Sequence, residues 1–273
     1  MYRSLGVAMQ SGLTSQSGGK RLKGVTPENS PNLPLVTVVT AVFNGAKTLE
    51  ATIQSVLGQT YRNIEYIIID GGSTDGTLDI IRKYDHAIDY WLSDLDKGVY
   101  DAMNKGIAAS RGTWLNFLNA NDVFCDASTI ESVATKYLHG DARFIYSDVL
   151  LKSGTRPLRR YVCDHKRLII NHQASIYDKA LHCEHGMYLV APRLTISDYL
   201  FFSLINQDDY TKADAPIAIY DTTGTSQSQR SVEQKFIVDY LVNGMPKYKF
   251  SLYFHFYHYY RTAKVALTNL RTR

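Results

Sequence analysis

Four short polar groups follow apolar runs in the first half of the chain and are the first candidates for a binding site. Their carboxylates and amides can hydrogen-bond to a polar ligand, and the last group ends in a single carboxylate, Asp122. The groups are residues 43–44, 70–72, 94–98 and 119–122. What these side chains can do depends on whether the fold brings them together.

The residues between 70 and 77, which read DGGSTDGT, do not match the common phosphate or calcium motifs. The segment lacks the lysine of a P-loop, and no GxGxxG sequence follows the first predicted strand. It begins like a calcium-binding loop, but Ile81 stands where a bidentate glutamate is needed. Asp70 before two glycines is also typical of a plain strand-to-helix turn, so that alternative stays open.

Hydrophobic periodicity predicts elements that would collect the four polar groups at one place. The predicted elements alternate strand and helix in the order 35–43, 48–57, 64–70, 74–84, 88–92, 99–109 and 114–118. Such alternation indicates βαβ units and a parallel sheet, an α/β fold. Ligands of these sheets bind at the carboxyl ends of the strands, so we expect the polar groups to line one crevice.

After residue 125 the pattern is looser, with a predicted helix near 127–137 and a strand over 144–150. The segment 182–185, His-Cys-Glu-His, could suggest zinc together with Cys163 and His165, but no pair has finger spacing, which favours packing roles. Asp198 lies in an apolar stretch that we expect to be helical. Its residue type fits either a solvent-facing carboxylate or a functional one.

Composition indicates an ordinary globular protein of 273 residues with three cysteines, the usage typical of a reducing compartment. A net charge of +4 is too small to indicate nucleic-acid binding, and no apolar run is long enough to span a bilayer. We expect a flexible leader over residues 1–33, one α/β domain over 34–230 and a C-terminal helical extension over 231–273. Six Lys or Arg, eight aromatics and no acid follow residue 242.

Two long segments resemble glycosyltransferase family 2, most of all its colanic-acid and exopolysaccharide-type members. They read VTVVTAVFNGAKTLEATIQSVLGQTYRNIEYIIIDGGSTDGT and DKGVYDAMNKGIAASRGTWLNFLNANDVF. The resemblance is strong over residues 35–125 and weaker to about 230. It implies a GT-A fold and an inverting transfer from a nucleotide-diphospho-sugar to a lipid-linked saccharide acceptor in surface polysaccharide biosynthesis.

The resemblance also implies roles for individual residues. Asp198 takes the place of the catalytic base that accepts the proton of the acceptor hydroxyl. Family members often carry a second aspartate after the one at Asp70, in contact with the base, where this chain has Gly71. The implied nucleotide-sugar contacts are Phe43, Asn44, Asp70, Asp96, Asn104 and Asn121.

The same resemblance places the metal site of the family on residues 119–122. Asn119 and Asn121 stand where two aspartates are usual, and the resemblance leaves Asp122 as the metal ligand. Mg²⁺ or Mn²⁺ prefers oxygen ligands and borrows phosphate oxygens, so one carboxylate with amides would hold it, but less tightly. His172 and Gln173 resemble residues on the acceptor side of the pocket.

The basic, aromatic tail predicts contact with an anionic membrane surface. Phe250, Tyr253, Phe254, Tyr257 and Tyr260 recur near helical spacing with cations nearby. We therefore expect a cytoplasmic protein that binds peripherally to the inner face of the cytoplasmic membrane and has no nucleic-acid partner. Two alternatives are a non-catalytic GT-A-like protein that binds sugar nucleotides or serves as a scaffold, and a nucleotidyltransferase. The loop FNGAKTL disfavours the latter because it lacks the glycine-rich, basic sequence usual there.

Overall fold

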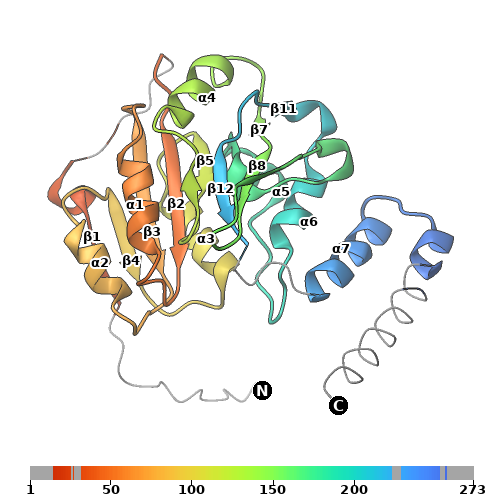
Figure 1. Cartoon of the computed structure of the whole chain (residues 1–273), viewed down its shortest axis with the longest axis horizontal. Helices are drawn as coiled ribbons and strands as arrows, with labels where there is room; N and C mark the ends of the chain where they lie inside the picture. Colours follow the sequence, from red (N-terminus) through yellow and green to blue (C-terminus); the bar gives the residue numbers. More distant parts are fainter. Residues whose placement is uncertain (1–14, 26, 28–31, 223–228, 253–255, 257–273) are drawn as a thin grey trace, which may run out of the picture.

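A computed structural model describes residues 15–25, 27, 32–222, 229–252 and 256 (Figure 1). Its centre is an eight-stranded mixed sheet in the order β1-β4-β3-β2-β5-β10-β7-β11. Four neighbouring strands run parallel, as predicted: β2 (Val36–Val42), β3 (Ile64–Asp70), β4 (Tyr90–Ser93) and β5 (Trp114–Phe117). Every residue of β2 is buried, which explains why its sequence is an almost continuous β-branched run.

Helices follow the first four parallel strands and close the βαβ units. They are α1 (Leu49–Leu57), α2 (Thr77–Lys83), α3 (Val99–Ala109) and, after β6, α4 (Thr129–Tyr137). Helix α3 packs closely against β2, because a Cβ atom on Gly106 would lie 2.4 Å from Val39 Cγ1. The first half of the chain therefore has the α/β order that the periodicity predicts.

The second half adds antiparallel strands and a smaller sheet. In the large sheet, β10 (Ser175–Asp178) runs antiparallel between β5 and β7 (Phe144–Tyr146), and β11 (Tyr210–Lys212) is parallel to β7. The small sheet has the order β6 (Val123–Phe124), β12 (Ala218–Asp221), β8 (Val149–Lys152) and β9 (Arg159–Tyr161). Short helices connect these strands: η2 (His165–Arg167), η3 (His172–Ala174), α5 (Leu181–His185) and η4 (Gln207–Asp209).

The prediction of a single strand over 144–150 is wrong, because the chain changes sheets at Ser147 and Asp148. The Asp148 carboxylate is buried at this corner, where it accepts the Cys163 N–H at 2.9 Å and pairs with Arg160 and Lys212. These partners come from distant parts of the chain. The sequence is therefore apolar on both sides of the corner, although the backbone leaves the large sheet there and enters the small one.

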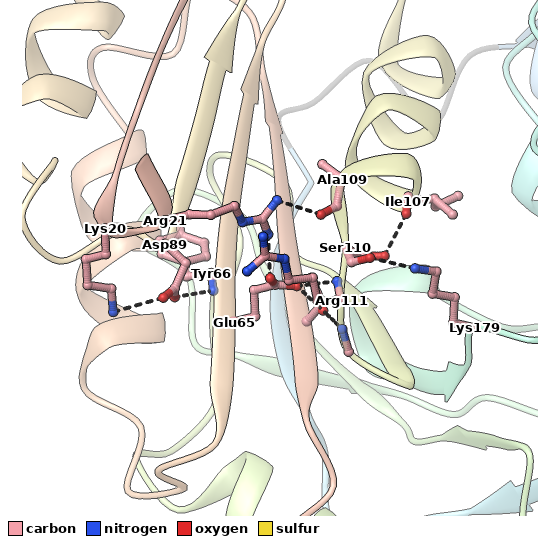
Figure 2. Close-up of polar contacts among 12 residues, drawn as sticks. Lys20, Arg21, Glu65, Tyr66, Asp89, Ile107, Ala109, Ser110, Arg111 and Lys179 are labelled. Carbon is pink, nitrogen blue, oxygen red and sulfur yellow. Dashed lines mark hydrogen bonds and ion pairs between the residues drawn. The ribbon is translucent and has the colours of Figure 1, made fainter. Parts of the chain in front are cut away.

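The prediction of a flexible leader through residue 33 is wrong for residues 16–23. Strand β1 (Gln16–Gly18) pairs antiparallel with β4, and η1 (Lys20–Lys23) follows it along the sheet. Figure 2 shows the contacts that hold η1: Arg21 reaches the Glu65 carboxylate and Ala109 O, and Lys20 reaches Asp89. We call this group of ion pairs the amino-edge cluster, because Glu65 and Asp89 lie at the amino ends of β3 and β4.

The described C-terminal part is helical over most of its length. Helix α6 (Ser197–Leu204) contacts α7 (Gln229–Leu241), where the Tyr199 hydroxyl donates to Asp239 (Figure 1). Residues 247–252 are again helical. Phe250 stacks on Tyr240 with ring centroids 4.5 Å apart, so this member of the predicted membrane-facing row packs inward. Four others, Tyr253, Phe254, Tyr257 and Tyr260, lie outside the described residues.

None of the helices in the described part of the chain is long and apolar enough to cross a bilayer.

Candidate active site

The polar groups after the parallel strands do meet at one edge of the sheet. Gly71 N donates to Val42 O at 2.9 Å, Asp94 N to Asp70 O at 3.0 Å, and Leu118 N to Val39 O at 3.0 Å. These bonds extend the strand pairing past the strand ends and keep the loops side by side. Beside the ends of β2 and β5 is an open groove of about 480 Å³, whose polar lining includes Asn44, Lys47, Asp75 and Asn121.

Asp198, in the first turn of α6, has the most elaborate surroundings at this edge. Its Oδ1 accepts a hydrogen bond from the Tyr100 hydroxyl at 2.7 Å, and its Oδ2 lies 2.8 Å from His172 Nδ1. Burial works to raise the pKa of this carboxyl, but the bonds from His172 and Tyr100 prevail and bring the pKa below its ordinary value. The side chain keeps 20% of its surface exposed. It is therefore a charged, oriented carboxylate that solvent can reach.

His172 connects Asp198 to the end of β5. Its Nε2 lies 3.0 Å from Asn119 Nδ2, and an amide nitrogen only donates, so Nε2 accepts and the ring proton is on Nδ1, directed at Asp198. We call the resulting chain of four side chains, Asn119–His172–Asp198–Tyr100, the acid–imidazole network. Sequence reasoning named Asp198 and His172 separately and missed Tyr100. The signal available was a tyrosine in the first turn of a helix that begins at the strand ends.

Asp122 lies beneath this network instead of facing the groove. It is 3% exposed; its Oδ1 accepts the Asp221 N–H at 3.0 Å and its Oδ2 accepts Gln173 Nε2–H at 2.8 Å. Burial raises its pKa to about 6. Gln173 is itself buried by this contact, so the prediction that it lines the acceptor side does not agree with the structure.

Two predicted nucleotide contacts have structural roles. The Asp70 carboxylate is fully buried and accepts hydrogen bonds from Ser73 and Ser93, the strand-to-helix turn that the sequence left open. The Asn104 side chain accepts from Tyr188 N at 3.0 Å and donates to Tyr188 O at 2.8 Å, so its amide is used within the protein. Both side chains thus have partners within the protein, and their contact with the nucleotide stays a prediction.

The remaining predicted contacts reach the surface of the groove or its rim. Phe43 is 64% exposed at the end of β2. Asn44 has a φ of 51° and accepts from Thr74 N, which joins the β2 end to the next loop, and Asn121 has a φ of 95° in the groove wall. Asp96 is partly exposed in the loop between β4 and α3. These four residues stay candidates for ligand contact.

The histidine-rich segment has a packing role. His182 is buried, stacks on Phe201 with ring centroids 4.2 Å apart, and lies 2.9 Å from the Tyr177 hydroxyl. Burial lowers the pKa of His182 to about 4. Within the described ranges, no group of three His, Cys, Asp or Glu side chains is arranged to hold a metal ion.

The chain matches the family model described as "Glycosyl transferase family 2" over residues 37–190. A PGL/p-HBAD biosynthesis glycosyltransferase of Mycobacterium bovis is 35% identical over 178 residues, 62% of this chain and 68% of that protein. An Escherichia coli protein, UDP-Glc:alpha-D-GlcNAc-diphosphoundecaprenol beta-1,3-glucosyltransferase, is 40% identical over 91 residues, 33% of this chain and 36% of that one.

Solved structures share the fold at low sequence identity. Staphylococcus aureus TarS in complex with UDP-GlcNAc has a TM-score of 0.61 and 17% identity over 76% of this chain and 65% of its own. The chain thus spans slightly less than two thirds of that TarS chain. A mannosyltransferase of Pyrobaculum calidifontis, in complex with GDP-Man and Mn²⁺, has a TM-score of 0.58 and 17% identity over 80% of this chain and 68% of its own.

The chain therefore belongs to glycosyl transferase family 2 and has the GT-A fold. The predicted enzyme class, a glycosyltransferase, is confirmed with it.

Proposed function

We propose that this chain is an inverting glycosyltransferase in which Asp198 is the catalytic base. The observation that carries the proposal is the acid–imidazole network. It keeps the partly exposed Asp198 carboxylate charged and oriented at the carboxyl ends of the strands. In the reaction, the acceptor oxygen forms a bond to the anomeric carbon while the bond from that carbon to the diphosphate breaks. The acceptor proton passes to Asp198, and the nucleoside diphosphate leaves with the electron pair of the broken bond.

The network explains why Asp198 suits this role. The Tyr100 hydroxyl and the Tyr199 N–H both donate to Oδ1, and His172 takes one position on Oδ2, which leaves a lone pair of Oδ2 for the acceptor hydroxyl. A lowered pKa keeps the carboxylate deprotonated at neutral pH, so it is ready to accept a proton as the hydroxyl becomes acidic in the transition state.

The residues around Asp122 fit a divalent cation. Buried amide oxygens of Asn119 and Gln173 have no hydrogen-bond donor in the described part of the chain, and Gln173 donates through its nitrogen to the Asp122 carboxylate. Oxygen-only sets suit Mg²⁺ or Mn²⁺. The Asn119 oxygen would hold the ion together with phosphate oxygens of the donor, and Asp122 would add negative charge beneath it. The ion would neutralise charge on the departing diphosphate.

For the acceptor, we propose a lipid-linked saccharide reached at an anionic membrane surface, on the cytoplasmic face. The supporting observations are the diphosphoundecaprenol acceptor in the name of the E. coli relative and the chemistry of the tail. Tyr248, Leu252 and Phe256 are each more than half exposed at a spacing of four residues, beside Lys247 and Lys249. Such a row suits an interfacial helix.

A flotation assay tests the membrane part of the proposal. Full-length protein should float with vesicles that contain anionic lipid and stay behind with neutral vesicles, whereas a Tyr248→Ser/Leu252→Ser/Phe256→Ser variant should stay behind with both. Equal recovery of the two proteins with anionic vesicles would refute surface binding through this row.

Donor binding and turnover test the catalytic part. A thermal-shift panel of UDP-, GDP- and TDP-sugars, with and without Mn²⁺, should show stabilisation by at least one donor. Purified enzyme should then hydrolyse or transfer that donor. Stabilisation without any turnover, and no loss of cellular function for Asp198→Asn, would favour the non-catalytic sugar-nucleotide-binding alternative.

A further inference from the structure

Gly71 and Asp96 share one place at the carboxyl edge of the sheet. A Cβ atom built on Gly71 would lie 2.5 Å from Asp96 Oδ2, closer than any real side chain allows. The Asp96 carboxylate thus occupies the space that a side chain at position 71 would fill. Asp96 reaches this space from the loop after β4, while Gly71 lies directly after β3.

The loop holds this carboxylate in a defined position. Asp96 Oδ1 accepts the Gly98 N–H at 2.8 Å, at the start of α3. Its Oδ2 has no hydrogen-bond partner among the described residues, and the side chain is only partly exposed. Burial raises the pKa of the carboxyl, as do the nearby Asp101 and Asp70, while Lys105 and the Gly98 bond lower it. The free oxygen of Asp96 is therefore an acceptor that the protein partly shields from water.

A flat apolar surface lies beside this acceptor. Gly71 N donates to Val42 O, so Phe43 and Gly71 follow neighbouring strands at the same level of the sheet. Phe43 is 64% exposed, so its ring is open to contact with a ligand. An exposed aromatic ring next to a fixed carboxylate oxygen suits a planar heterocycle that can stack and donate a ring N–H.

We propose that Asp96 selects the base of the nucleotide donor by accepting its ring N–H in the space left by Gly71. This inference rests on the proposed use of a nucleotide-diphospho-sugar and names the class of base. Uracil, thymine and guanine carry a ring N–H next to a carbonyl. Cytosine and adenine present a ring nitrogen lone pair there, which the carboxylate repels.

Nucleotide affinities test the proposal. Calorimetry of the full chain with UDP, TDP, GDP, CDP and ADP, each with Mn²⁺, should show at least one of the first three binding at least about tenfold more tightly than CDP and ADP. The variant Asp96→Asn keeps an oxygen for Gly98 N–H and presents an amide N–H₂ in place of Oδ2. The affinity of this variant for the preferred nucleotide should fall about tenfold, and the variant should bind CDP at least as tightly as the wild type does.

A control and a rescue make the result specific. Asp79→Asn removes the same charge from the exposed face of α2 and should leave the order of affinities unchanged. Gly71→Asp combined with Asp96→Ala moves the carboxylate to the neighbouring strand end, where φ is not left-handed, and should restore the wild-type preference. If the ratio of the affinity for the preferred nucleotide to that for CDP is the same in wild type and Asp96→Asn, the inference is wrong, but the proposed use of a nucleotide donor still stands. If none of the five nucleotides binds the wild type, the proposed function fails as well.

Discussion

The two edges of the central sheet both bury carboxylates, but they neutralise them differently. In the amino-edge cluster, Glu65 and Asp89 are nearly inaccessible and have cation partners, Arg21 and Lys20 (Figure 2). At the carboxyl edge, the side-chain donors found for Asp122 and Asp198 among the described residues are an amide, an imidazole and a phenol.

The amino edge therefore stabilises the fold, and the carboxyl edge keeps charges that the proposed binding site can use. A buried carboxylate with its own cation has its charge compensated before any ligand arrives, and it mainly fixes the fold. A carboxylate held by neutral donors keeps its charge and its affinity for a cation or a proton. Asp122, whose pKa is raised by burial, lowers the stability of the free protein at neutral pH, a cost often found at active sites.

Replacing Asp198 should have the largest effect on turnover of all the variants and little effect on stability. Asp198→Asn keeps the shape but cannot accept a proton, so turnover should fall by about 10²–10⁴-fold. Initial-rate measurements with the donor found by thermal shift check this, and the melting temperature should change little. Asp208→Asn, on the exposed η4 turn, is the matched control and should retain full activity. An Asp198→Asn enzyme within threefold of wild type would contradict the assignment.

At the amino edge the opposite pattern is expected. Glu65→Gln leaves Arg21 without its counter-charge in a partly buried position, which should lower the free energy of unfolding by about 3 kcal/mol. Urea denaturation measures the loss, and turnover per folded molecule should stay unchanged. Glu50→Gln, which breaks an exposed pair with Lys83, should lower the free energy of unfolding far less. Equal losses in the two variants would remove the distinction between the edges.

His172 tests whether the network positions the base. His172→Ala removes the donor to Asp198 Oδ2 and should lower kcat by about 10- to 100-fold with little change in the KM for the donor sugar. His172→Asn keeps an N–H near the position of Nδ1 and should recover most of the rate. A purely structural role predicts instead that both variants lose stability together and that asparagine rescues nothing.

Asp122 should show stability and activity changing in opposite directions. Its pKa is raised to about 6 in the folded state, so the folded protein binds the proton more tightly than the unfolded chain does. The contribution of Asp122 to the free energy of unfolding is therefore most favourable below pH 4. It decreases by up to about 3 kcal/mol as the pH rises from about 4 to 6 and is constant above that.

Asp122→Asn should consequently be more stable than wild type at pH 8 in EDTA, by about 1–3 kcal/mol, and the gain should shrink towards pH 4. The Gln173 amide can turn to accept from the new amide group, which uses its unpaired oxygen. Chemical denaturation at several pH values measures this. Turnover should fall at the same time, because the negative charge beneath the proposed cation is lost. If the gain in the free energy of unfolding does not depend on pH, Asp122 is not a buried carboxylate that is charged at pH 8.

The sequence by itself determined the parallel half of the sheet, because each of those elements is specified within its own residues. The runs that become β2 and β3 are apolar along their whole length, and the helical spacing of α3 matches its buried face. Strand ends in such a fold must meet at one edge, so the position of the crevice also followed from the sequence. The polar ends of these strands were therefore predictable as a group.

Tertiary structure alone decided which of those polar side chains face a ligand. Asp70 and Asp122 read as site residues, yet they are buried by Ser93 and Gln173, which come from other strands or loops. Tyr100 reads as a helix residue and contacts Asp198 across 98 positions of sequence. Likewise, only pairing with β4 turns residues 16–18 into a strand. Periodicity records what one element buries, and it carries no information about the partners that a distant segment brings.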